Sequence, residues 1–227
     1  MLHGQADPLA WLNGIRRQAG VHAVTRDALL SRTADAWAAR LAAAGILTHR
    51  GDDGSSGLDR YRALGGTEAR VGEILGAGPD IVHVEKGWMA SAEHRQLAVS
   101  PVWTHAGWGS AASGDSQVSV MMFTQKRVND LLIAQDLADL TVSGMFVPLD
   151  AAGAVLYNGL EQVSPLTWDP ASRRFAFAVS GSAIAGYLRL GFVAADGRFT
   201  LTNAFTWPPG TGSREAPGRF SSPVPSP

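Results

Sequence analysis

The stretch Val71-Gly72-Glu73-Ile74-Leu75-Gly76-Ala77-Gly78 places one acidic residue inside a short apolar segment. A carboxylate among Val, Ile and Leu is costly to bury unless a partner offsets its charge. His49 lies at the edge of a glycine-rich loop, Arg60 follows that loop, and His94 lies further along the chain. If Glu73 has a structural role and holds loops together, we expect a histidine or Arg60 to offset its charge. A binding role for Glu73 is the alternative.

Helices are predicted on both sides of this stretch. Asp7-Pro8 is a typical helix start, with Asp as the cap and Pro in the first turn, and the helix should run to about Ala19. Apolar residues recur at steps of three and four up to Ala44, which predicts a second helix that Gly45 ends. Two further elements are expected: a helix that opens at Pro79-Asp80, and a buried strand over residues 117–125.

The second half of the chain has a different pattern. Residues 127–139 are polar and compatible with a helix, so we interpret them as a linker. Beyond them, short stretches alternate or are rich in strand formers, and turns separate them, one of which is expected at residues 150–153. This pattern is typical of a small antiparallel sandwich. These stretches are residues 142–147, 174–179, 187–193 and 198–205. The expected division is therefore 1–126, 127–139 as linker, 140–207 as the β domain and 208–227 as a tail with six prolines.

The composition of the chain argues against several classes of function. The 227 residues carry a net charge of -1, which argues against broad electrostatic binding of nucleic acid. There is no cysteine, so disulfides and thiolate chemistry are excluded. No apolar run approaches the roughly 18–20 residues that span a bilayer, and the N-terminus lacks the pattern of a signal peptide. All histidines precede residue 127, which places chemistry near neutral pH in the first half.

Several motifs occur in a characteristic order. They are Leu12-Asn13-Gly14-Ile15-Arg16, His49, Asp59-Arg60-Tyr61-Arg62-Ala63-Leu64-Gly65, Val71-Gly72-Glu73-Ile74-Leu75, Trp88-Met89-Ala90-Ser91-Ala92-Glu93-His94-Arg95, Gly107-Trp108-Gly109 and the strand that ends at Gln125. Over roughly residues 8–125 the chain resembles the bacterial branch of the CAP superfamily, also called the SCP domain (cysteine-rich secretory protein, antigen five, pathogenesis-related). The resemblance implies a three-layer α-β-α sandwich with a cleft, so the expected fold class is α+β, with the β-sandwich domain following.

The resemblance also implies a site. His49, Glu73 and His94 match family positions that face one another in the cleft, where zinc or another divalent cation has been seen. Two imidazoles and a carboxylate suit a zinc site with an open position. The sequence departs from the family pattern at Ile74, where Asn is usual, and at Ala92-Glu93, where Pro-Gly is usual. Ser91 stands where eukaryotic members carry a second acidic residue.

Two functions follow from this site. The first is an extracytoplasmic binding protein, periplasmic or secreted, whose cleft holds a metal, a lipid or another small or cell-envelope ligand, and whose C-terminal half binds a protein partner. The alternative is a metal-assisted peptidase or esterase with Glu73 as general base, or a metal-free variant that pairs Ser91 with His94. No protease or esterase signature occurs, which favours binding over catalysis.

The remaining candidates have structural interpretations. We expect His22, His83 and His105 to be structural or solvated, and Trp11, Trp37 and Trp88 to belong to the core. The C-terminal half is short for an independent core, so we expect it to dock on the first domain through an apolar face.

Overall fold

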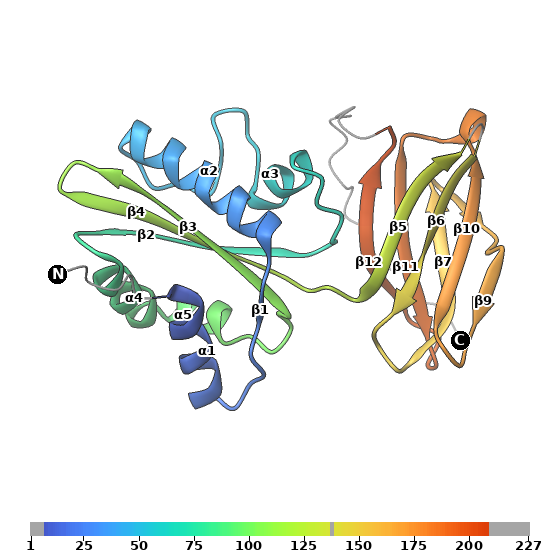
Figure 1. Ribbon diagram of the computed structural model, residues 1–227, viewed down its shortest axis with the longest axis horizontal. Coiled ribbons are helices and arrows are strands. Elements are labelled where there is room, and N and C mark those ends of the chain that lie inside the picture. Colours follow the sequence, from blue (N-terminus) through green and yellow to red (C-terminus); the bar gives the residue numbers. More distant parts are fainter. Residues whose placement is uncertain (1–6, 137–138, 209–227) are drawn as a thin grey trace, which may run out of the picture.

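The computed structural model describes residues 7–136 and 139–208. The first part, up to residue 126, is a sheet between two layers of helices (Figure 1). Its elements are α1 (Pro8–Gln18), β1 (Thr25–Arg26), α2 (Ala28–Ala44), α3 (Gly57–Ala63), β2 (Val71–Gly78), α4 (Ile81–Ala90), α5 (Ala92–Ala98), β3 (His105–Ser113) and β4 (Ser116–Thr124). The three-layer fold expected from the sequence is confirmed.

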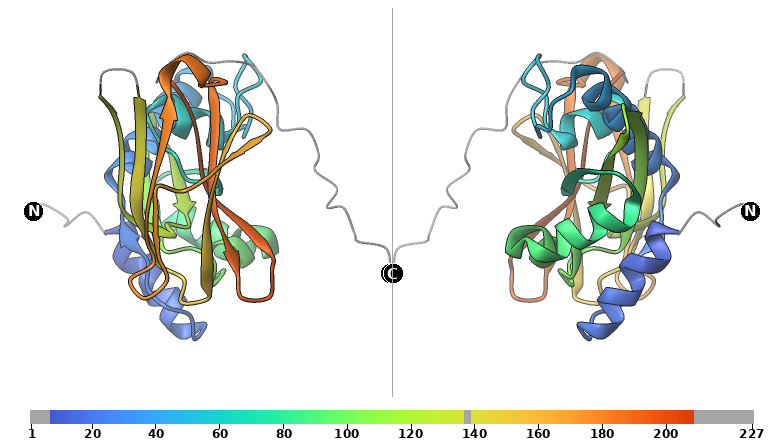
Figure 2. Two further views of the ribbon diagram at one scale, coloured as in Figure 1. Left: turned by 90° about the vertical axis from the view of Figure 1, so that its right-hand side faces the viewer. Right: turned by 90° about the vertical axis from the view of Figure 1, so that its left-hand side faces the viewer.

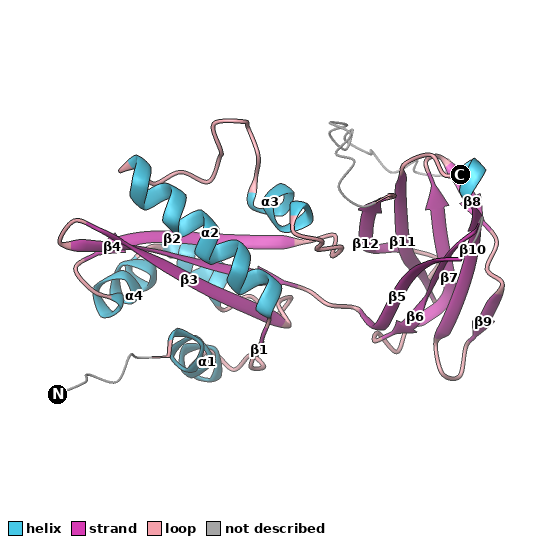
Figure 3. Ribbon diagram, turned by 45° about the horizontal axis from the view of Figure 1, so that its top comes forward, coloured by secondary structure: helices cyan, strands magenta, loops and turns pink. Residues whose placement is uncertain are grey.

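The sheet has the strand order β1-β3-β4-β2, so β2 is an edge strand and pairs antiparallel with β4. Helices α2 and α3 cover one face, whereas α1, α4 and α5 cover the other (Figures 1 and 3). Successive side chains of β2 alternate between these layers. Ile74 packs with Trp88 of α4, and the next residue, Leu75, packs with Trp37 and Tyr61 on the opposite face.

Local signals explain the long helices. Asp7 caps α1 by accepting a hydrogen bond from the Leu9 amide at 3.0 Å, and Gly45 ends α2 with a φ of 67°. Helix α2 lies so close to β3 that a Cβ atom at Gly107 or Gly109 would collide with its main chain. The Gly107-Trp108-Gly109 motif is therefore a contact between a helix and a sheet.

A buried arginine joins helices α1 and α5, which lie on the same face of the sheet. Arg16 of α1 is 0% exposed, and its Nη1 atom donates to the carbonyls of Ala98 at 2.7 Å and Ser100 at 3.0 Å. These carbonyls lie at the C-terminal end of α5, where main-chain acceptors lack helical partners. Arg16 thereby joins the first helix to the connection between α5 and β3.

The C-terminal part is a sandwich of two four-stranded sheets, with strand orders β5-β6-β10-β9 and β12-β11-β7-β8 (Figures 1 and 2). Its strands are β5 (Val128–Asp136), β6 (Asp139–Phe146), β7 (Ala151–Asn158), β8 (Glu161–Val163), β9 (Thr167–Asp169), β10 (Arg174–Ser180), β11 (Tyr187–Ala194) and β12 (Phe199–Thr206). Phe146, Phe175 and Phe192 meet in its core. The predicted β-sandwich is therefore confirmed.

Two local predictions in this part were wrong. Residues 127–139 were expected to be a helix-compatible linker, but Val128–Asp136 forms β5 and pairs with β6. Val128, Leu131 and Ile133 of this strand pack against the core of the sandwich. The turn expected at residues 150–153 is also shorter than predicted, because β7 begins at Ala151. Of the expected tail at 208–227, residues 209–227 lie outside the described residues.

The two parts meet through main-chain pairing, whereas the sequence led us to expect an apolar face. The Ala69 amide donates to the Thr202 carbonyl at 2.9 Å, and the Ala204 amide donates to the Thr67 carbonyl at 2.6 Å. Glu68 forms an antiparallel bridge with Asn203. The segment from Thr67 to Ala69 thus lies along β12 and pairs with it through one bridge. The buried core of the sandwich is formed by residues from 140 onward.

We expect a fragment of residues 127–208 to unfold cooperatively on its own, because the core of the sandwich draws on its own strands. A fragment that starts at residue 140 should show no cooperative transition, since it lacks β5 and exposes the edge of β6. Thermal unfolding followed by circular dichroism compares the two. Equal cooperativity would mean that β5 is dispensable for the core.

Candidate functional site

Glu73 lies on the edge strand β2, which contacts α3 on one side and α4 and α5 on the other. Its side chain is only 7% exposed. Both carboxylate oxygens have partners: Nη2 of Arg60 donates to Oε2 at 2.7 Å, and Nδ1 of His49 lies 2.8 Å from Oε1. The expectation that a histidine or Arg60 offsets this charge agrees with the geometry, because both residues contact Glu73.

Arg60 reaches Glu73 because α3 begins at a fixed point. Ser56 and Asp59 form a capping box at the N-terminus of this helix. The guanidinium of Arg60 lies 3.6 Å from the ring centroid of Trp37 on α2, a cation–π contact that holds it in place. The same guanidinium donates to the carbonyls of Ser55 at 3.1 Å and His49 at 3.3 Å. Arg60 therefore fixes both the carboxylate and the loop that carries His49.

His49 extends from this loop with 57% of its side chain exposed. When Nδ1 carries the proton and donates it to Glu73, Nε2 keeps a lone pair that can accept a hydrogen bond. A carboxylate paired with a histidine commonly fixes the tautomer and the ring orientation in this way. In that tautomer the site presents one exposed, oriented acceptor atom.

His94 lies on the first turns of α5, half-buried and apart from the Glu73 hydrogen bonds. Burial lowers the pKa of the His94 imidazole, and the charge that His49 carries when it is protonated lowers it further. Both effects favour the neutral form of the ring. Ser91 caps α5, and its hydroxyl accepts from the His94 amide at 3.4 Å; within the described residues no hydrogen bond joins that hydroxyl to the His94 ring.

The three residues with a predicted metal role do not form a metal-binding cluster. Across residues 7–136 and 139–208, no group of three or more His, Cys, Asp or Glu side chains is close enough to hold a metal ion. Arg60 and His49 each contact one oxygen of Glu73. Catalytic zinc sites usually have three protein ligands, and the side chains of the described residues do not group closely enough to supply three. The spacing of these donors does not fit zinc.

The other singled-out residues have structural contacts. His22 lies 2.9 Å from the Trp103 carbonyl, and His83 lies 2.7 Å from the carboxylate of Asp80, which caps α4. His105 begins β3 and lies 2.9 Å from the Thr104 hydroxyl. Trp37 and Trp88 are buried, and Trp11 is partly buried against the same cluster as Trp88. The sequence interpretation missed the role of Trp37 beneath Arg60, because no spacing rule links α2 to α3.

Comparison with known proteins identifies the family of the N-terminal part. A profile of the cysteine-rich secretory protein family, CAP, matches residues 9–126, about half of the chain. The chain belongs to the CAP family. The resemblance seen in the sequence is thereby confirmed for the CAP domain, although this member has no cysteine. A comparison with curated proteins finds no match.

Several solved structures are similar to the chain. One is an outer surface protein of Borrelia burgdorferi, with 18% identity and a TM-score of 0.49; the match covers 52% of this chain and 89% of that protein. An extracellular SCP-domain protein of Bacillus anthracis, at 20% identity and a TM-score of 0.47, covers 51% and is covered over 38%. A cysteine-rich secretory protein of Staphylococcus aureus, at 17% identity and a TM-score of 0.42, covers 56% and is covered over 40%. The chain thus spans less than half the length of the last two proteins.

Replacing Arg60 with Ala should destabilise the CAP domain by about 3–5 kcal/mol, because it leaves the buried carboxylate of Glu73 without its cation. Urea denaturation gives the free energy of unfolding. Arg40→Ala is the matched control: Arg40 also lies near Trp37 and pairs with Asp52, but that pair is exposed, so the control should unfold like the parent. Equal stability of the two variants would show that Glu73 does not need Arg60.

We expect an NMR titration of the imidazole signals to give His94 a pKa below its ordinary value, because the ring is partly desolvated and close to His49. In His49→Ala the His94 pKa should rise part of the way back, since burial remains while the neighbouring charge is gone. His83→Ala removes an exposed histidine on α4 and should leave the His94 pKa unchanged. No rise in the His49 variant would show that the two rings are not coupled.

Proposed function

We propose that this CAP-family protein is an extracytoplasmic binding module that holds a small ligand at the surface around His49, Glu73 and His94. One observation carries the proposal: both oxygens of the Glu73 carboxylate are already bonded, to Arg60 and to His49. Such a carboxylate orients its neighbours. Both contacts direct the two oxygens towards Arg60 and His49.

The ligand would contact two imidazoles that differ in their exposure to solvent. His49 offers an exposed Nε2 acceptor whose direction is set by Glu73. His94 offers a half-buried ring whose neutral form is favoured. Two acceptors of this kind suit a ligand with hydroxyl or amide donors, and the faces of the rings can pack against its apolar part. A lipid or a sugar of the cell envelope has this chemistry.

The hydrolase alternative has less support. A general base must lie within reach of the proton that it removes, whereas the Glu73 side chain is only 7% exposed and each of its oxygens contacts Arg60 or His49. A serine nucleophile needs a hydrogen bond to its histidine, whereas the Ser91 hydroxyl accepts from the main chain of His94. Binding is therefore the function that these contacts favour.

The extracytoplasmic location is also part of the proposal, and it rests on the name of the family, which describes secreted proteins. No helix within the described residues is long and apolar enough to cross a membrane. The β-sandwich that follows the CAP domain has large exposed side chains, among them Leu149 at 84% and Leu160 at 87% exposure. These side chains suit contact with a protein partner.

Two titrations test the proposal. Zinc added to the metal-stripped protein in a calorimeter should give no stoichiometric binding, because the side chains of the described residues do not group closely enough to supply three ligands. Decanoate and N-acetylglucosamine, as apolar and sugar probes, should shift the imidazole NMR signals of His49 and His94 but not that of His83. Stoichiometric zinc binding that is lost in a His49→Ala, His94→Ala double variant would overturn the proposal in favour of a metal centre. The proposal would also be contradicted if neither probe shifted the NMR signal of His49 or His94.

A further inference from the structure

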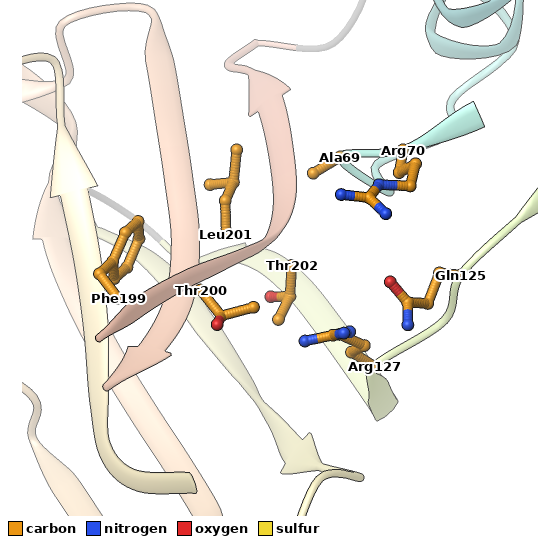
Figure 4. A pocket seen from close by; sticks show the side chains of 8 residues that line it. All are labelled: Ala69, Arg70, Gln125, Arg127, Phe199, Thr200, Leu201 and Thr202. Atoms are coloured by element: carbon orange, nitrogen blue, oxygen red, sulfur yellow. The ribbon is translucent and has the colours of Figure 1, made fainter. Parts of the chain in front are cut away.

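A second candidate site lies where the CAP domain meets the β-sandwich. A cavity of about 430 Å³ opens there, between the end of β4, the segment before β2 and strand β12. The CAP side contributes Arg70 and Gln125, Arg127 follows between the two parts, and the sandwich contributes the stretch from Phe199 to Thr202 (Figure 4). The volume is within the range of about 300–1,000 Å³ that is usual for small-molecule sites.

The shape of the cavity follows from the strand beside it. Asn203 pairs with Leu190 and Leu201 pairs with Gly191, so Thr202 is an extra residue on β12. Such a bulge bends a strand and increases its twist. The segment from Thr67 to Ala69 pairs with β12 between Thr202 and Ala204, so the pairing ends at the bulged residue. The cavity begins at this point, beside Ala69 and Thr202, and extends along β12 to Phe199.

The electrostatics of the cavity are unusual for this protein. Arg70 and Arg127 both line it (Figure 4), and no ion pair or side-chain hydrogen bond of either guanidinium occurs in the described part of the chain. Most other arginines here have such a partner, as Arg16, Arg60 and Arg173 show. Partial burial and the charge of Arg70 lower the pKa of Arg127, which Asp150 counteracts without an ion pair. The two cations therefore repel each other across a space that an anion can fill.

The remaining lining defines the rest of the ligand. Gln125 and Thr200 add an amide and a hydroxyl, which can bond to oxygen atoms next to the anionic group. Phe199 and Leu201, which are 43% and 38% exposed, form an apolar wall on the sandwich side. Arginine pairs recognise phosphate and carboxylate groups through paired N–H donors. The donors, the wall and the volume together suit a small organic anion.

We propose that this cavity is a binding site for a small organic anion, a phosphate ester or a carboxylate, held between Arg70 and Arg127 against β12. The site is independent of the Glu73 site, since it shares no residue with it. A ligand held here contacts both parts of the chain. Binding should therefore stabilise their junction as well as the fold.

Calorimetric titration of the full chain with glycerol 3-phosphate, inorganic phosphate and succinate tests the proposal. We expect glycerol 3-phosphate or succinate to bind, and its affinity to fall by about tenfold or more in Arg70→Gln and in Arg127→Gln, because each loses a charged donor. The bound probe should also raise the unfolding temperature of the parent but not of these variants. Both arginines are at least partly exposed, so the variants should fold, which their unfolding temperatures without ligand will check.

Two controls separate this site from other effects. Arg198→Gln removes an exposed arginine near the same strand, paired with Asp196 at 2.7 Å, and should bind the probe as the parent does. His94→Ala should also bind normally, since it belongs to the Glu73 site. Binding of glycerol 3-phosphate alone would identify a phosphate ester, and binding of succinate alone would identify a carboxylate. Binding of inorganic phosphate alone would overturn the proposal of an organic ligand. Failure of all three probes to bind, or binding that both arginine substitutions leave unchanged, would overturn the proposal.

Discussion

The burial of the Glu73 carboxylate is the constraint on which the upper layer of the CAP domain depends. An unpaired charge with 7% exposure would be unstable on a strand packed between helices. Its cation comes from Arg60, and the position of Arg60 requires the capped start of α3 and the ring of Trp37 beneath it. Even Gly57 is part of this arrangement, because a Cβ atom there would lie 3.1 Å from Oε2 of Glu73.

The same contacts determine what the site can do. The carboxylate contacts an arginine and a histidine, so the part of this group that faces solvent is the imidazole of His49. His94 approaches from α5 on the other side of β2 and contributes a ring whose charge is suppressed. In this chain His49 and His94 thus place two imidazoles near an ion-paired carboxylate. The departures at Ile74 and Ser91 agree with this result, since neither residue adds a charged ligand.

Local chemistry made much of the fold predictable, whereas contacts between distant elements did not. Asp7, Gly45 and Asp80 act within one turn of the chain, and the helices begin and end where they indicate. Strand β5 was missed because only some of its apolar residues face the core, while Leu132 is 56% exposed, which gives a pattern that a surface helix can share. At the site, the sequence indicated which residues would pair with Glu73, namely a histidine or Arg60. The contact of Arg60 with Trp37 joins two helices and has no signature in either.

The junction holds together the two parts of the chain, each of which has its own core. An exposed edge strand invites pairing with other molecules, and here the segment from Thr67 to Ala69 covers one stretch of β12. Glu68 in that segment accepts from the Tyr61 hydroxyl at 2.6 Å inside the CAP domain, so the segment is anchored on both sides. The cover stops where β12 bulges, and Arg70, the residue that follows the segment, lines the opening that remains. The pairing that joins the two parts therefore also places a cation at the mouth of the cavity between them.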